Sequence, residues 1–375
     1  MYEIDAKDLP TAYIQSVDKD TNQVTCVTSR LILSSETDFA FVMDNLVTPI
    51  INQLPKNSGI QPSTVDHLLA ITGPDHKCKV YVNELGLRTS VRSKSSVRKG
   101  QVVYSEQIAD VERLEFHGVE IPADAGVVVV LSHQWGKSLF FDTGPIMEGD
   151  KNKRDFDIGE VLGQCQNRML FQHLYEITAE QWETLFQQRW FPFMGLKHQT
   201  MKLMRRYLDS GGNCDDLLDD IVAEVKAGLP GWIKSWESRP SFANHMGFIS
   251  RAAERFMEKD YISSISILYP RIEGVLRSIA PNQGDSRLHQ SKLAKSALEA
   301  SGISTRAFSA LLPEAFSEYL EKVFFADFQP DETPPMSRNA VVHGAAREEQ
   351  FSEKEAVIAF LILHQIFYHH PRKTT

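Results

Sequence analysis

The chain has 375 residues and a mass of 42.5 kDa, more than one ordinary hydrophobic core holds, which predicts two or three domains. Hydrophobic residues make up 42% and charged residues 24%, close to the globular average, so a fibrous or largely disordered protein is excluded. A net charge of −9 argues against a protein that coats nucleic acid without specificity. Any contact with nucleic acid must therefore use a local patch.

The sequence gives no sign of a membrane or secretory protein. No apolar run approaches the roughly 18 residues that a membrane span needs, and the first residues lack a basic region followed by an apolar stretch. The cysteines stand far apart and form no Cys-x-x-Cys pair, which argues against a zinc ribbon or a disulfide framework; they are Cys26, Cys78, Cys165 and Cys214. We expect a cytoplasmic protein with no membrane partner.

Residues 1–150 are predicted to form an α+β domain built on a mostly antiparallel sheet. Short β-rich runs alternate there with turn residues, and the stretch 38–54 has its apolar residues at helical spacing. The run 127–131 is apolar throughout and predicts a central strand. The predicted strands are 12–17, 24–33, 67–72, 79–82, 101–104, 111–116, 127–131 and 138–141.

A charged connector at 148–154 marks the predicted boundary to an all-helical region, divided into a helical connector at 151–240 and a helical domain at 241–375. Thr178 and Gln181 have the spacing of a capping box. Residues 258–280 form the strongest predicted helix, with a kink expected at Pro270. The last helix starts at Ser352 and is apolar nearly all round, so it belongs in a core or at a subunit interface.

The sequence lacks the phosphate-binding loop, the dinucleotide-binding turn, the zinc-protease histidine pair and the nucleophile elbow. One candidate motif remains. It reads Ser337-Arg338-Asn339-Ala340-Val341-Val342-His343-Gly344, and Ser337 after Pro334-Pro335 is a suitable N-cap for a helix over the motif. An arginine and a histidine with four residues between them are a weak pattern alone. The sequence contains two similar pairs, Arg168–His173 with four residues between and Arg239–His245 with five. Only in the motif does asparagine follow the arginine and glycine follow the histidine.

With these residues, positions 241–375 resemble the HEPN superfamily, helical ribonuclease and nucleotide-binding domains common in bacterial toxins and phage-defence proteins. The resemblance also rests on the Pro-Arg-Ile-Glu-Gly segment at 270–274 and on the closing apolar helix. It implies a metal-independent endoribonuclease with catalytic Arg338, Asn339 and His343, and Glu273 as a weaker nominee. It further implies a homodimer in which two motifs share one cleft. In a subgroup a tyrosine stands two residues after the histidine, where this chain has Ala345, so regulation through that tyrosine is not expected.

The motif also suits RNA cleavage on chemical grounds. Attack by the 2′-hydroxyl requires proton transfer, for which histidine is suited because its ordinary pKa lies near neutrality. Arginine offers donors that fit two phosphate oxygens, and asparagine can hold a phosphate oxygen or orient the imidazole. We therefore expect RNA as the partner, no cofactor and no metal, and a cognate antitoxin is conceivable. Three further arginines are weaker candidates for contact with nucleic acid: Arg271, Arg277 and Arg347.

Other interpretations of these residues remain open. Arg338 and His343 lie about 140° apart on an ideal helix, which requires a distorted helix end or a second subunit. Arg338 could instead pair with a carboxylate, and His343 could end a helix before Gly344 as a left-handed stop. Glu273 could pair with Arg277 four residues on. The basic run 88–99 fits a solvated hairpin or loop, or a contact with phosphates. The alternative function is a non-catalytic helical module that binds a nucleotide or a protein, with a ligand-sensing N-terminal domain.

Overall fold

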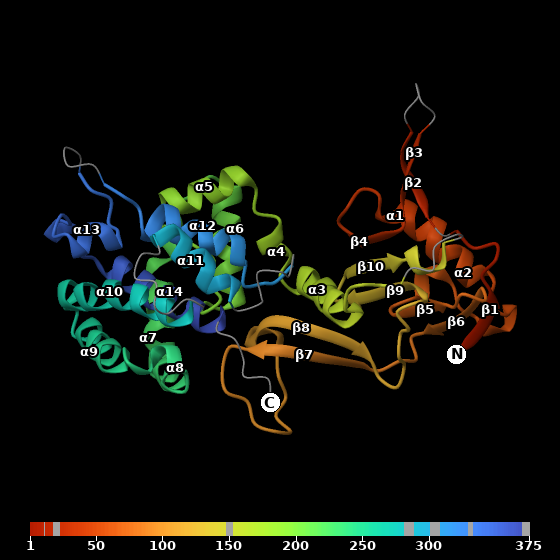
Figure 1. Ribbon diagram of the computed structural model, residues 1–375, viewed down its shortest axis with the longest axis horizontal. Coiled ribbons are helices and arrows are strands. Elements are labelled where there is room, and N and C mark those ends of the chain that lie inside the picture. The colour runs from red at the N-terminus through yellow and green to blue at the C-terminus, as the bar shows by residue number, and fades with distance from the viewer. Residues whose placement is uncertain are drawn as a thin grey trace. The chain divides into compact units, whose positions relative to one another are not determined.

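The computed structural model describes residues 1–10, 12–17, 23–147, 153–280, 289–300, 308–328 and 333–369. The chain divides into two compact units, each described by itself here (Figure 1). The first, the sheet unit, comprises Met1–Val91 and Val111–Phe171; the second, the helical unit, comprises Arg92–Asp110 and Gln172–Thr375. The predicted α+β class with an antiparallel N-terminal sheet and a helical C-terminal region is confirmed.

The sheet unit is built on six strands, each antiparallel to its neighbours (Figure 1). Their spatial order is β1 (Tyr2–Asp5), β6 (Lys77–Val82), β5 (Leu68–Thr72), β9 (Gly126–His133), β10 (Gly136–Asp142) and β4 (Ser29–Leu33). β9 lies between β5 and β10, so the prediction of a central strand at 127–131 is confirmed. A separate hairpin pairs β2 (Tyr13–Val17) with β3 (Val24–Val27).

The apolar run in β9 is continuous because both faces of the sheet are covered. Val128 and Val130 belong to one hydrophobic cluster, whereas Val127, Val129 and Leu131 belong to the other. The first face packs against α1 (Phe39–Val42), η1 (Met43–Val47) and α2 (Thr48–Asn52), which together confirm the helix predicted at 38–54. The second packs against β8 (Ile108–Phe116) and α3 (Ile158–Leu170).

β8 pairs with β7 (Leu87–Ser93), and the chain passes from one unit to the other within both strands. The strand predicted at 101–104 is wrong: this stretch has no strand partner and lies in the connection between β7 and β8. The units differ from the predicted ranges 1–150 and 151–240 in two places. Arg92–Asp110 belongs to the helical unit, and α3, which packs on the sheet, belongs to the sheet unit.

Polar contacts attach the segment Arg92–Asp110 to the rest of the helical unit. Nζ of Lys94 donates to the carbonyl of Leu196 (2.6 Å), and the guanidinium of Arg92 donates to the carbonyl of Tyr368. The buried carboxylate of Asp110 accepts from the backbone N–H of Ala310 (2.9 Å). Part of the run 88–99 does lie in a strand, β7, that pairs with β8. The expected solvation is wrong for Arg92 and Lys94, whose cationic groups are bonded to main-chain oxygens within the unit.

The helical unit contains helices of very different length (Figure 1). They are α4 (Gln172–Tyr175), α5 (Ala179–Gln187), α6 (His198–Asp209), α7 (Leu218–Glu237), α8 (Pro240–Ala243), α9 (Met246–Met257), α10 (Tyr261–Ile279), α11 (Gln290–Glu299), α12 (Pro313–Tyr319), η7 (Leu320–Phe324), α13 (Arg338–Val342) and α14 (Glu353–His369). The capping box at Thr178 and Gln181 is present. The strongest predicted helix is found as α10, with Pro270 in its interior.

The last helix, α14, is buried within its own chain. Its residues from Glu355 to Ile366 are all buried, and it packs against α7 and α10. The predicted location in a core is thus confirmed, and α14 offers no bare apolar face for a second subunit. The predicted homodimer therefore rests on the resemblance and on the spacing of Arg338 and His343. None of the described helices is long and apolar enough to cross a membrane.

Candidate functional site

The motif forms a five-residue helix, α13, that is capped at both ends as its sequence predicts. The hydroxyl of the fully buried Ser337 accepts from the N–H of Ala340 (3.1 Å), which confirms it as the N-cap. At the other end Gly344 has φ +69°, and the N–H of Ala345 donates to the carbonyl of Ala340 (2.8 Å). This is a Schellman ending, which only a residue tolerant of the left-handed region closes without strain.

Glu273 of α10 brings two predicted arginines together. Its Oε1 accepts from Nε (2.9 Å) and Nη2 (2.7 Å) of Arg277 one turn further along the helix. Its Oε2 lies 2.6 Å from Nε of Arg338, in an ion pair whose N–H is not aligned for a hydrogen bond. The side chain of Glu273 is 8% exposed and that of Arg338 is 18% exposed. A single buried carboxylate therefore holds two guanidinium groups side by side.

Asn339 lies next to this group and is fully engaged by the protein. Its Nδ2 donates to the carbonyl of Phe325 and to Oδ1 of Asp327, both at 3.0 Å. Its Oδ1 accepts from Nε2 of Gln290 (2.8 Å) and from Nη1 of Arg338 (3.2 Å). Since both amide hydrogens and the oxygen are used, Asn339 fixes neighbouring groups in this arrangement instead of reaching toward a phosphate.

His343 stands apart from the Arg338 group, at the C-terminal end of α13. Its side chain is exposed, and its ring centroid lies 6.4 Å from that of Phe328. The N–H of His343 still donates to the carbonyl of Asn339, so the helix turns regularly as far as this residue. An exposed imidazole at a helix end can exchange protons with a substrate.

Of the three arginines that are weaker candidates for nucleic-acid contact, one belongs to this group. Arg277 shares Glu273 with Arg338. Arg271 stacks its guanidinium over the half-exposed ring of Phe248, 4.0 Å from the centroid, on another side of α10. Arg347 is exposed in the turn after α13. The structure thus gathers Glu273, Arg277, Arg338 and Asn339, whereas no hydrogen bond or ion pair between described residues joins Arg271 or Arg347 to them.

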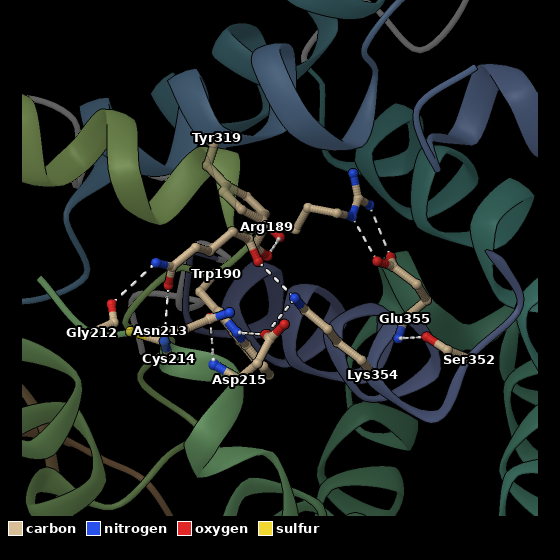
Figure 2. A network of polar contacts seen from close by, with 11 residues as sticks. Arg189, Trp190, Gly212, Asn213, Cys214, Asp215, Tyr319, Ser352, Lys354 and Glu355 are labelled. Carbon is tan, nitrogen blue, oxygen red and sulfur yellow. Dashed lines mark hydrogen bonds and ion pairs between the residues drawn. The ribbon is translucent and has the colours of Figure 1, made fainter. Parts of the chain in front are cut away.

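A buried polar network lies elsewhere in the helical unit, and the sequence did not point to it (Figure 2). Arg189 bonds Glu355 through Nε (2.6 Å) and Nη2 (2.9 Å), and the hydroxyl of Tyr269 donates to the same carboxylate (2.9 Å). Burial opposes the charge of Arg189, but Glu355 more than offsets it and raises the pKa of Arg189. Arg189 has φ +63°, and its carbonyl accepts from the hydroxyl of Tyr319 (2.9 Å).

A second part of this network joins the 3-10 helix η6 (Cys214–Leu217), which precedes α7, to α14 (Figure 2). Nζ of Lys354 donates to the carbonyl of Gln188 (2.8 Å) and to the carboxylate of Asp215. The same carboxylate accepts from Nε1 of Trp190 (2.7 Å). Because every charge here has a partner within the protein, we interpret the network as a structural connection between segments distant in sequence. Only a pair such as Lys354-Glu355 at the start of an apolar helix could have suggested it.

Two of the buried histidines, His198 and His364, make hydrogen bonds that fix their ring protons or ring position. Nε2 of His198 lies 3.1 Å from the carbonyl of Ile108, which can only accept, so the neutral ring carries its proton on Nε2. Burial and the nearby Lys94 lower the pKa of His198 to about 3. Nδ1 of His364 accepts from Nε1 of Trp236 (3.2 Å), and burial lowers the pKa of His364. Burial likewise lowers the pKa of Lys94 to about 7.

Comparison with known proteins adds no relative to these observations. No protein-family model, no curated protein and no solved structure matches the chain.

Proposed function

We propose that the helical unit is a metal-independent endoribonuclease of the HEPN type, a toxin or an effector of defence against phage. The observation that carries this proposal is the group formed by Glu273, Arg338 and Asn339, with the exposed His343 at the other end of the same short helix. The arginine offers a phosphate-binding group and the histidine an acid–base group, the two that cleavage needs. RNA is the proposed substrate, and the proposed state is a homodimer.

In this mechanism Arg338, at the start of α13, binds the phosphate, and His343, at its end, transfers protons. Arg338 has five N–H donors. Among the described residues its guanidinium makes one hydrogen bond, from Nη1 to Asn339, and one ion pair, from Nε to Glu273, so donors remain for the scissile phosphate. His343 accepts the proton of the 2′-hydroxyl or delivers one to the leaving 5′-oxygen. Since the two residues are about 140° apart on an ideal helix, His343 of one subunit and Arg338 of the other would act on one phosphate in a shared cleft.

A specific observation favours the second function, a module that binds a nucleotide or a protein without cleaving it. Asn339 is buried with its amide fully engaged, and Arg338 is already paired with a carboxylate. A site that had lost catalysis would retain such contacts for stability. Both functions predict a folded α13, so only activity separates them.

The test is cleavage of total bacterial RNA by the purified protein in the presence of EDTA. Arg338→Ala and His343→Ala should each abolish cleavage, a loss of more than about 100-fold, because they remove phosphate binding and proton transfer. Arg251→Ala is the matched arginine control, since Arg251 is 62% exposed and pairs with Glu254 on α9. His245→Ala, the histidine of a similar pair in the sequence, should leave cleavage unchanged.

Circular dichroism spectra confirm that each variant is folded before its activity is compared. Cleavage that depends on added Mg²⁺, or a His343→Ala variant with the wild-type rate, would contradict the mechanism. A wild-type protein that binds RNA or a nucleotide without cleaving it would establish the second function. Mixing inactive Arg338→Ala and His343→Ala subunits tests the shared cleft, because mixed dimers should recover one intact cleft and part of the activity.

A further inference from the structure

Both ends of the motif helix α13 contact one short segment, residues 325–328, which directly follows η7. At the first end, Nδ2 of Asn339 donates to the carbonyl of Phe325 and to Oδ1 of Asp327. At the second end, the ring of Phe328 faces the imidazole of His343 with 6.4 Å between centroids. The segment therefore contacts Asn339 in the first turn of α13 and His343 just after its last residue, although the sequence motif includes no residue of the segment.

The contacts of Asn339 determine which way its amide points. On one side stand two groups that can only accept, the carbonyl of Phe325 and the carboxylate of Asp327. On the other side stands the guanidinium of Arg338, which can only donate. The Nδ2 group must therefore face residues 325–327, and Oδ1 must face Arg338.

We propose that Asp327 is a positioning residue for Arg338 and acts through Asn339; this inference rests on the proposed function. Asp327 holds the Nδ2 group of Asn339, which leaves Oδ1 to bond Nη1 of Arg338. Glu273 holds Nε of the same guanidinium from α10. Arg338 is thus fixed from two sides, with its side chain still 18% exposed.

Removal of the Asp327 carboxylate takes away one of the two acceptors of Nδ2. The amide of Asn339 can then turn over and direct its N–H groups at the guanidinium, where donor would meet donor. Arg338 would lose the contact to Asn339 and move more freely about its remaining ion pair with Glu273. Catalysis that depends on a fixed arginine falls when its geometry loosens by about an ångström.

The test compares Asp327→Ala with Asp327→Asn and uses Glu321→Ala as the matched control. Asparagine at 327 can still offer an oxygen to Nδ2 of Asn339, whereas alanine cannot. Glu321 is an exposed acid on η7, so its loss changes the charge by the same amount nearby. Two quantities are measured: the kcat and KM of cleavage of an RNA oligonucleotide in EDTA, and the rate at which phenylglyoxal modifies Arg338, followed by mass spectrometry.

In Asp327→Ala we expect kcat to fall about tenfold or more with KM within about twofold, because the arginine is misplaced and not removed. Modification of Arg338 should become several times faster. Asp327→Asn and Glu321→Ala should match the wild type in both quantities. An Asp327→Ala protein with wild-type kcat and wild-type modification rate, in an enzyme that cleaves RNA, would overturn the inference alone. A wild-type protein that cleaves no RNA would overturn the proposed function, and the modification rates would still decide whether Asp327 positions Arg338.

Discussion

Of the interactions in the helical unit, the ion pair between Arg189 and Glu355 should cost the most free energy of unfolding when it is broken. The change is Glu355→Gln, which keeps the shape of the side chain but removes its charge. The side chain of Glu355 is 6% exposed and accepts two bonds from Arg189 and one from Tyr269. Breaking a buried pair by removing one partner costs about 3–5 kcal/mol, and the 19% exposure of Arg189 favours the lower end.

The assay is urea unfolding followed by tryptophan fluorescence, which reports mainly on the helical unit because four of the five tryptophans lie there. For an m-value of about 2 kcal/mol/M, a loss of about 3 kcal/mol moves the midpoint by about 1.5 M. The control is Glu353→Gln on the same helix, whose carboxylate is 30% exposed beside Lys226 and should contribute less than about 1 kcal/mol. A Glu355→Gln midpoint equal to that of the control would refute the reasoning.

Two further predictions concern stability. The helical unit should become less stable as the pH falls below about 6.5, because unfolded histidines bind protons there whereas folded His198, with its pKa lowered to about 3, does not. At pH 5 this residue accounts for about 2 kcal/mol, so His198→Gln should show a flatter profile of urea midpoint against pH, and an unchanged slope would contradict the assignment. Gly163→Ala should lower the melting temperature of the sheet unit by circular dichroism, because its Cβ would lie 2.9 Å from the backbone nitrogen of Arg113, at a cost of about 1–3 kcal/mol. Gly231→Ala, on an open surface of α7, is its control, and an equal effect of both changes would show that the close approach does not matter.

Local signals in the sequence predicted most elements because their causes are local. The strand at 127–131 followed from an apolar run, and both caps of α13 followed from Ser337 and Gly344. The strand predicted at 101–104 failed for the opposite reason. Val102 and Val103 have the side chains of a strand, yet a strand needs a neighbour to accept its hydrogen bonds, and propensity does not supply one.

The candidate site could be predicted only in part. Arg338, Asn339 and His343 were found from their spacing, and the pair of Glu273 with Arg277 from the helical repeat. The bonds from Asn339 to Phe325 and Asp327 could not be foreseen, because they join backbone and side-chain atoms brought together by tertiary packing. For the same reason the cations of the basic run 88–99 looked solvated, although Arg92 and Lys94 reach carbonyl groups far along the chain.

The assignment of Arg92–Asp110 to the helical unit bears on how this chain can be divided or exchanged. A fragment that begins after Phe171 would lack the groups that bond the carbonyls of Leu196 and Tyr368 and the N–H of Ala310. Those buried polar groups would have to find water or remain unpaired, each at a cost of about 1–3 kcal/mol. The helical unit is therefore not a cassette that recombination could transfer in one continuous piece, and a swapped version would need the β7–β8 connection as a second, separately inherited part.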